Sequence, residues 1–121
     1  MLSSYKELTV WQKSIELVAE IYNLTKNFPK EEVFGLTSQI KRSAVSIPSN
    51  IAEGYARKHR PEYIQFMRIA FGSGAELETQ IIIAKKLTLT KAEKFKKCDG
   101  LLEEIMKMLN KMISSLNSPK P

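Results

Sequence analysis

The chain of 121 residues has one cysteine, Cys98, so an internal disulfide is impossible and a reducing compartment is expected. It has one histidine, His59, with no second imidazole and no cysteine pair, which argues against a zinc site. Its longest apolar run, residues 81–84, falls far short of the roughly 20 residues that a membrane helix needs. Since the N-terminus also lacks the apolar stretch of a signal peptide, we expect a cytoplasmic protein with no membrane partner.

The sequence also lacks a nucleotide-binding loop. Gly72-Ser73-Gly74 has no strand before it and no G-x-x-x-x-G-K pattern, and acidic residues follow where a lysine would be required. Close helix packing at Gly72 and Gly74 is the better account, because small residues let two backbones approach. We therefore predict no cofactor and no small-molecule substrate.

No catalytic arrangement is recognisable among the polar residues. Glu53, Glu76 and Glu78 are the carboxylates suited to acid–base chemistry, but Glu76 and Glu78 are two residues apart and point to different faces of one helix. The serines lack a histidine partner, and no set of metal ligands accompanies Glu53. We predict that the protein is not an enzyme, since a hydrolase using Glu53 would need a buried cleft around that residue.

Apolar residues recur at helical spacing along most of the chain, and no segment has the pattern of a strand. The pattern predicts four helices, over residues 10–27, 36–57, 61–87 and 91–116. Thr90 and Glu93 form a capping box for the fourth helix. Short connections favour a single all-α domain, an antiparallel up-down-up-down four-helix bundle, with residues 117–121 as a short disordered tail.

The second helix carries a proline in its interior, Pro48. Proline removes one backbone hydrogen bond and clashes with the carbonyl four residues earlier, at a cost of about 3 kcal/mol. We therefore expect the carbonyl of Ala44 to lose its partner and the helix to be kinked near Ile47. The same helix is rich in small residues that let a neighbouring helix approach closely: Ser43, Ala44, Ser46, Ser49 and Ala52.

The third and fourth helices are apolar over more than one stripe. Ile81, Ile82 and Ile83 together sweep about 200° around the helix axis, and Met108 widens the apolar face of the fourth helix. Because broad apolar patches on a small domain mark interfaces, we predict self-association through Ile81, Ile82, Ile83 and Met108. The alternative is that Ile82 is merely a scattered exposed apolar residue.

The net charge of +6 at pH 7 lies in the later part of the chain. Residues 1–35 carry four basic and five acidic side chains (4 − 5 = −1), whereas residues 36–88 carry eight and four (8 − 4 = +4). Residues 89–121 carry seven and four (7 − 4 = +3). This balance favours an anionic partner such as RNA or DNA.

The basic residues divide between the two ends of an up-down-up-down bundle. Arg57, Lys58 and Arg60 belong to the turn before the third helix, about 30 Å from the turn after it if that helix has some 20 to 25 residues. The second turn carries Lys85, Lys86, Lys91, Lys94, Lys96 and Lys97. Assembly into a ring would multiply each patch along one rim and favour binding to a phosphate backbone. In the alternative interpretation, these side chains only solvate helix ends.

Several motifs resemble the four-helix bundle family of proteins encoded in 23S ribosomal RNA intervening sequences. They are Leu8-Thr9-Val10-Trp11-Gln12-Lys13, Asn27-Phe28-Pro29, Phe34-Gly35-Leu36, Ser46-Ile47-Pro48-Ser49-Asn50-Ile51-Ala52-Glu53-Gly54, and Gly72-Ser73 with Glu76-Leu77-Glu78-Thr79. The resemblance covers about residues 5–116, and it implies a bacterial cytoplasmic protein with a left-handed bundle and a homopentameric ring. The architecture is also similar to accessory proteins of diversity-generating retroelements, whose basic pentameric barrels bind nucleic acid.

The resemblance implies no established enzymatic activity. Position matching within the family singles out Lys41, Arg42 and Arg57, and the neighbouring Lys58 and Arg60 complete the predicted nucleic-acid-binding set. The leading hypothesis is a non-enzymatic, oligomeric bundle that binds RNA or DNA through these residues. The alternative is a structural or protein-interaction module whose partner docks on apolar helix surface.

Overall fold

The computed structural model describes residues 3–118, and all regular structure in that range is helical. The α-helices are α1 (Thr9–Thr25), α2 (Leu36–Arg57), α3 (Arg60–Lys86) and α4 (Lys96–Asn117). Three short 3-10 helices accompany them: η1 (Tyr5–Glu7), η2 (Lys30–Glu32) and η3 (Ala92–Phe95). The prediction of an all-α protein with four helices is therefore confirmed. None of the helices in the described range is long and apolar enough to cross a membrane.

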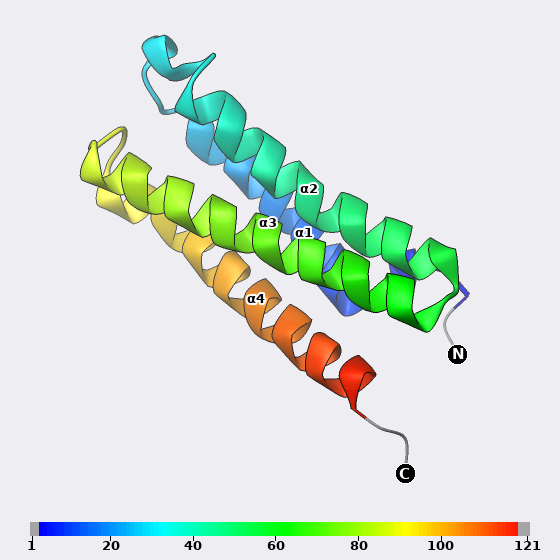
Figure 1. The fold of residues 1–121 in the computed structure, drawn as a ribbon. Coiled ribbons are helices and arrows are strands. Elements are labelled where there is room, and N and C mark those ends of the chain that lie inside the picture. The colour runs from blue at the N-terminus through cyan, green and yellow to red at the C-terminus, as the bar shows by residue number, and fades with distance from the viewer. Residues whose placement is uncertain (1–2, 119–121) are drawn as a thin grey trace.

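The four α-helices lie side by side, and each runs opposite to the helix before it in the chain (Figure 1). α1 and α3 each contact both α2 and α4, so the helices close around a shared core. The connections at 26–35 and 87–95 lie at one end of the bundle, and the turn at 58–59 lies at the other (Figure 1). This is the up-down-up-down order expected from short connections. The left-handed twist of the bundle stays a prediction.

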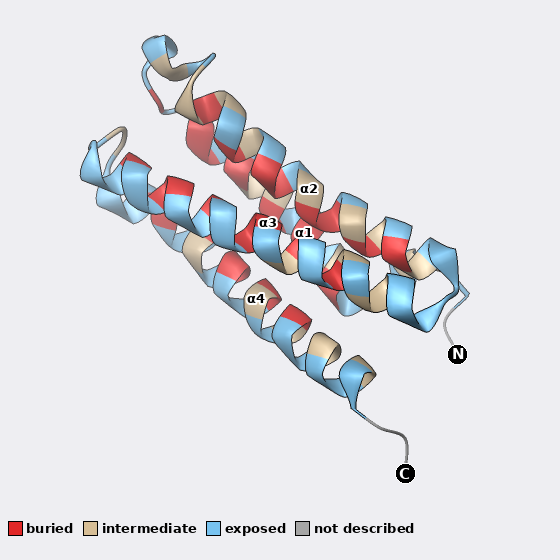
Figure 2. Ribbon diagram, viewed as in Figure 1, coloured by how far each residue is buried: buried red, intermediate tan, exposed pale blue. Residues whose placement is uncertain are grey.

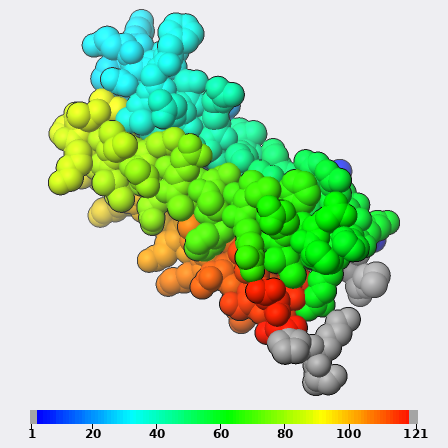
Figure 3. All heavy atoms as spheres, viewed as in Figure 1, coloured from blue at the N-terminus to red at the C-terminus, as the bar shows by residue number. Residues whose placement is uncertain are grey.

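Each helix turns a stripe of buried residues toward the others (Figure 2), and side chains fill the space between the ribbons (Figure 3). The stripes follow the helical spacing of the apolar residues, with fully buried members on every α-helix: Leu17, Ile21, Ile47, Ile51, Leu77, Ile105 and Leu109. Burying a side chain of this size stabilises the fold by about 1.5–3 kcal/mol relative to exposure. The apolar stripe, rather than intrinsic helix propensity, therefore holds a segment such as α2 in place.

Helix α2 continues without a break through Pro48, which is buried. Side chains next to the proline supply local hydrogen bonds. Ser49 Oγ donates to the carbonyl of Val45 at 2.9 Å, and Asn50 Nδ2 donates to the carbonyl of Ser46 at 2.8 Å. These polar residues stabilise carbonyls close to the site where the proline removes a donor. The bend near Ile47 stays a prediction.

α1 ends at Thr25 rather than at residue 27, and both ends of α4 also differ from the sequence-based expectation. α4 begins at Lys96 rather than at residue 91. No side chain caps either η3 or α4, so the prediction of a capping box formed by Thr90 and Glu93 is wrong. Lys91 is extended, and the η3 turn that follows it places Phe95 in the core. At its other end α4 includes Asn117, which the prediction assigned to a disordered tail, while 119–121 lie outside the described residues.

Close helix packing involves Gly54 and Gly74 but not Gly72. A Cβ atom built on Gly54 would lie 2.7 Å from Phe66 Cβ, so α2 and α3 approach closely there. A Cβ atom on Gly74 would overlap the side chain of Met106 on α4. Nothing lies within 4 Å of the corresponding position on Gly72. The packing prediction is therefore confirmed at Gly74 and wrong at Gly72, which faces open space.

Candidate nucleic-acid interface

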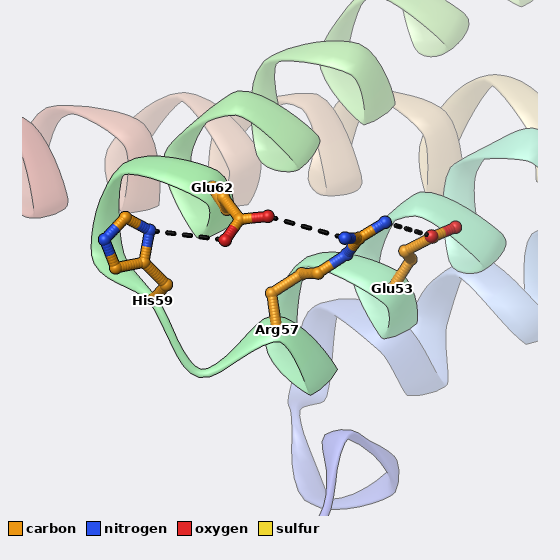
Figure 4. Close-up of polar contacts among 4 residues, drawn as sticks. All are labelled: Glu53, Arg57, His59 and Glu62. Atoms are coloured by element: carbon orange, nitrogen blue, oxygen red, sulfur yellow. Dashed lines mark hydrogen bonds and ion pairs between the residues drawn. The ribbon is translucent and has the colours of Figure 1, made fainter.

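Arg57, near the C-terminal end of α2, is held between two carboxylates (Figure 4). Its Nη2 lies 2.9 Å from Glu53 Oε2, and its Nη1 lies 3.5 Å from Glu62 Oε2. The guanidinium also lies over the ring of Phe66, 5.1 Å from its centroid. His59 Nδ1 approaches the other carboxylate oxygen of Glu62 at 3.3 Å. Two carboxylates offset the charge of Arg57, so a phosphate would have to compete with them.

The other two predicted residues of this turn differ in their surroundings. Arg60 Nε donates to the backbone carbonyl of Leu116 at 2.8 Å, which ties the start of α3 to the end of α4. Lys58 lies in the left-handed region, with φ of 56°, and terminates α2. It is exposed and forms no ion pair with the described residues. Of the three predicted basic residues in this turn, Lys58 is the one that presents a charge without a partner among the described residues.

Lys41 and Arg42 lie on α2, well away from that turn. Fifteen residues separate Arg42 from Arg57 along the helix, a distance of about 22 Å at 1.5 Å per residue. Lys41 Nζ lies 4.6 Å from the centroid of the Tyr22 ring, and Arg42 is exposed with no ion pair or hydrogen bond to the described residues. The structure therefore does not bring the five predicted residues together on one surface.

A second group of cations lies at the opposite end of the bundle, around the α3–α4 connection. Lys85 pairs with Asp99 at 2.6 Å, and Lys97 pairs with Glu20 at 3.2 Å. The remaining lysines of this connection are exposed and have no carboxylate partner among the described residues. We call them the lysine end: Lys86, Lys91, Lys94 and Lys96. The sequence already shows this concentration of positive charge, because residues 85–97 include six basic residues and one acidic residue.

Lys41 and Arg42 share this half of the bundle. Ser43, next to Arg42, donates a hydrogen bond to Gln80 of α3 at 2.9 Å, which places these two positions at the same level. Lys86 follows Gln80 by six residues, about 9 Å farther along α3. The predicted set is therefore divided: Lys41 and Arg42 lie near the lysine end, and Arg57, Lys58 and Arg60 lie at the other end.

The predicted interface residues also divide. Ile81 is only 2% exposed and packs in the core of its own chain, so it offers little surface to the predicted oligomer interface. The apolar run on α3 turns Ile81 inward and leaves Ile82 at 50% and Ile83 at 42% exposure. Met108 is half-buried and lines an apolar groove between the N-terminal part of α1 and the C-terminal part of α4. Ile82 and Ile83 are the members that present apolar surface.

The residues considered for catalysis have ordinary structural surroundings. Glu53 is exposed and paired with Arg57 rather than set in a buried cleft, which contradicts the hydrolase hypothesis. Burial raises the pKa of the Cys98 thiol to about 12, and the nearby carboxylates of Glu20 and Asp99 add to the shift. The thiol is therefore protonated at neutral pH and is a poor nucleophile. Within residues 3–118, no group of three or more His, Cys, Asp or Glu side chains could hold a metal ion.

The 23S rRNA-intervening sequence protein family matches residues 6–111 of the chain. The chain belongs to this family. A search of curated proteins gives no match. Among solved structures, the chain is similar to a protein of unknown function from the S23 ribosomal protein family of Bacteroides thetaiotaomicron, with 28% identity and a TM-score of 0.80. The similarity covers 87% of this chain and 98% of the other. The resemblance noted from the motifs is thus confirmed.

Proposed function

We propose that this protein is a non-enzymatic module that binds the phosphate backbone of RNA or DNA. The lysine end supplies most of the contacts, and Lys41 and Arg42 extend the surface along α2. Each bound phosphate releases counterions, which is the main source of affinity for a protein that reads charge rather than sequence. Arg57 and Arg60 contribute less, because each already has a partner within the chain.

The observation that carries this proposal is the set of four unpaired lysines at one end of the bundle. Cations that lack a carboxylate partner keep their full charge for a ligand, whereas paired cations must first lose a partner. The overall charge of +6 points the same way. The names of the family and of the similar structure refer to ribosomal RNA and to a ribosomal protein family, which makes RNA the first partner to test.

Charge removal at the two ends of the bundle tests the proposal. We expect alanine at Lys86, Lys91, Lys94 and Lys96 together to weaken binding to a structured RNA by more than about tenfold at low salt. The matched control removes four exposed lysines elsewhere: Lys6, Lys58, Lys107 and Lys111. Fluorescence anisotropy measures both affinities. Equal losses in the two variants would contradict a localised surface, because each variant loses the same net charge.

We also propose that copies of the chain associate through the outer face of α3, as the family resemblance to a homopentamer implies. Ile82 and Ile83 place adjacent apolar surface in water, and burying it against another copy is favourable. A ring would repeat the lysine end around one rim. Sedimentation should therefore show an oligomer in the wild type and a smaller species in Ile82→Glu. A wild-type monomer at micromolar concentration would contradict this proposal.

A structural or protein-interaction role is the second candidate. Phe34, in the α1–α2 connection, is 98% exposed, and such an aromatic side chain suits contact with another protein. Binding of this kind would depend weakly on salt and strongly on apolar residues. The salt dependence of complex formation therefore distinguishes it from binding to a phosphate backbone.

A further inference from the structure

Helices α2 and α3 border a polar groove of about 420 Å³ close to the lysine end. It is lined by Gln39, Arg42, Ser43, Ser46, Glu76 and Gln80. Ser43 Oγ donates to Gln80 Oε1, and Ser46 Oγ lies 2.8 Å from Ser73 Oγ, so hydrogen bonds between the two helices form its base. Apolar side chains between two helices of a bundle would cost less free energy, because buried polar groups need hydrogen-bond partners. The groove is open to solvent, so a ligand can enter it from the surface.

Arg42, Glu76 and the amide nitrogen of Gln80 have no partner in this groove among residues 3–118. Gln80 is only 6% exposed, and its Oε1 accepts from Ser43, but its Nε2 donates to none of the described residues. Among the described residues, the buried side-chain atom without a hydrogen-bond partner is Thr37 Oγ1, so Gln80 Nε2 is reached by solvent and is open to a ligand. Arg42 and Glu76 line the two walls and form no ion pair with each other or with another described residue. The groove therefore offers a cation, a carboxylate and an amide donor to a ligand.

Glu76 and Gln80 are one turn apart on α3, so their side chains are neighbours on one face, with about 5–6 Å between Cβ atoms. This pair sets a carboxylate acceptor beside an amide donor. The Watson–Crick edge of guanine has the complementary order, with two adjacent donors, N1–H and N2–H, beside the O6 acceptor. Adenine, cytosine and uracil do not present two adjacent donors to a carboxylate. Unpaired bases are the part of RNA that proteins read in this way.

We propose that this groove binds an unpaired guanine of a nucleic-acid strand. Glu76 accepts from N1–H and N2–H of the base, Gln80 Nε2 donates to O6, and Arg42 binds the phosphate of the same nucleotide. The inference rests on the proposed function, because the strand that supplies the guanine continues onto the lysine end. It adds a base preference to binding that otherwise depends on charge alone.

The test compares two uridine-rich RNA oligonucleotides that differ in one central base, guanine or adenine. We expect the wild type to bind the guanine strand about tenfold more tightly, within the usual discrimination of a paired hydrogen-bond contact. Glu76→Gln should reduce this preference below about threefold, because the amide presents a donor where the base needs an acceptor. Glu78→Gln is the matched control, since Glu78 is exposed, carries the same charge and lies outside the groove.

The outcomes separate this inference from the proposed function. Equal wild-type affinities for the two strands would overturn the guanine site and leave phosphate binding intact, whereas no binding of either strand at low salt would overturn both. The guanine site would also be overturned if Glu76→Gln kept the preference for guanine, or if Glu78→Gln lost that preference to the same extent. Guanosine monophosphate should compete only weakly, because it lacks contacts to the lysine end. Displacement of the RNA strand by an equimolar amount of guanosine monophosphate would identify the free nucleotide as the ligand and overturn the strand proposal.

Discussion

Replacing Phe95 by alanine should lower the free energy of unfolding by about 3–5 kcal/mol, the usual cost of emptying an aromatic position in a core. Phe95 is 1% exposed, and its ring centroid lies 6.2 Å from that of Phe28. These two residues join the α1–α2 and α3–α4 connections at one end of the bundle. Lys85 Nζ lies 5.6 Å from the Phe95 ring centroid, so the substitution also removes a cation–π contact.

Urea unfolding followed by circular dichroism measures this change, and the chain supplies its own control. Phe34→Ala removes the same side chain from a position that is 98% exposed, and it should change stability by less than about 0.5 kcal/mol. A loss at Phe95 no larger than the change at Phe34 would contradict the packing of η3 against the core.

Gly54→Ala should destabilise the protein by about 1–3 kcal/mol, in spite of the higher helix propensity of alanine. The added methyl group would lie 2.7 Å from Phe66 Cβ, 3.2 Å from Met67 Cε and 3.4 Å from Tyr63 Cδ1. Phe66 Cβ is fixed to the backbone of α3, so rotation of a side chain cannot relieve the overlap. The two helices must separate or the bundle must lose packing along this contact.

The same substitution at Gly72 gives the opposite expectation. Nothing lies within 4 Å of a Cβ atom there, so Gly72→Ala should stabilise the protein by about 0.5–1 kcal/mol through helix propensity alone. The stability of Gly74→Ala should lie between those of Gly54→Ala and Gly72→Ala, because the obstructing Met106 side chain is flexible. Denaturant midpoints of the three variants test the order. Equal stability of Gly54→Ala and Gly72→Ala would contradict the close approach of α2 and α3.

Helical periodicity was sufficient to predict the number and approximate bounds of the helices. The start of α4 was not predictable in this way, because the core position of Phe95 depends on Phe28 from another part of the chain. The 3.6-residue period also does not decide which member of an apolar run faces inward. Ile81 and Ile82 are the same residue type, and only the packing of α3 places Ile81 in the core and exposes Ile82 to water.

The candidate site was predictable in its charge but not in its geometry. The pair of Glu53 and Arg57 has the i,i+4 spacing of a helical ion pair and could have been recognised in the sequence. The second partner, Glu62, lies on α3 and becomes apparent only when α2 and α3 are placed together. For the same reason Lys41 and Arg42 were grouped with Arg57, although they lie nearer the lysine end.

The salt dependence of RNA binding tests the central proposal most directly. If about four lysines at one end of the bundle contact phosphates, affinity should fall about 100-fold between 50 and 200 mM salt. Alanine at Lys86, Lys91, Lys94 and Lys96 should flatten that dependence, whereas the control variant with four lysines removed elsewhere should largely retain it. A wild-type affinity that changes less than about twofold over this range would contradict a phosphate-binding surface and favour an apolar protein contact.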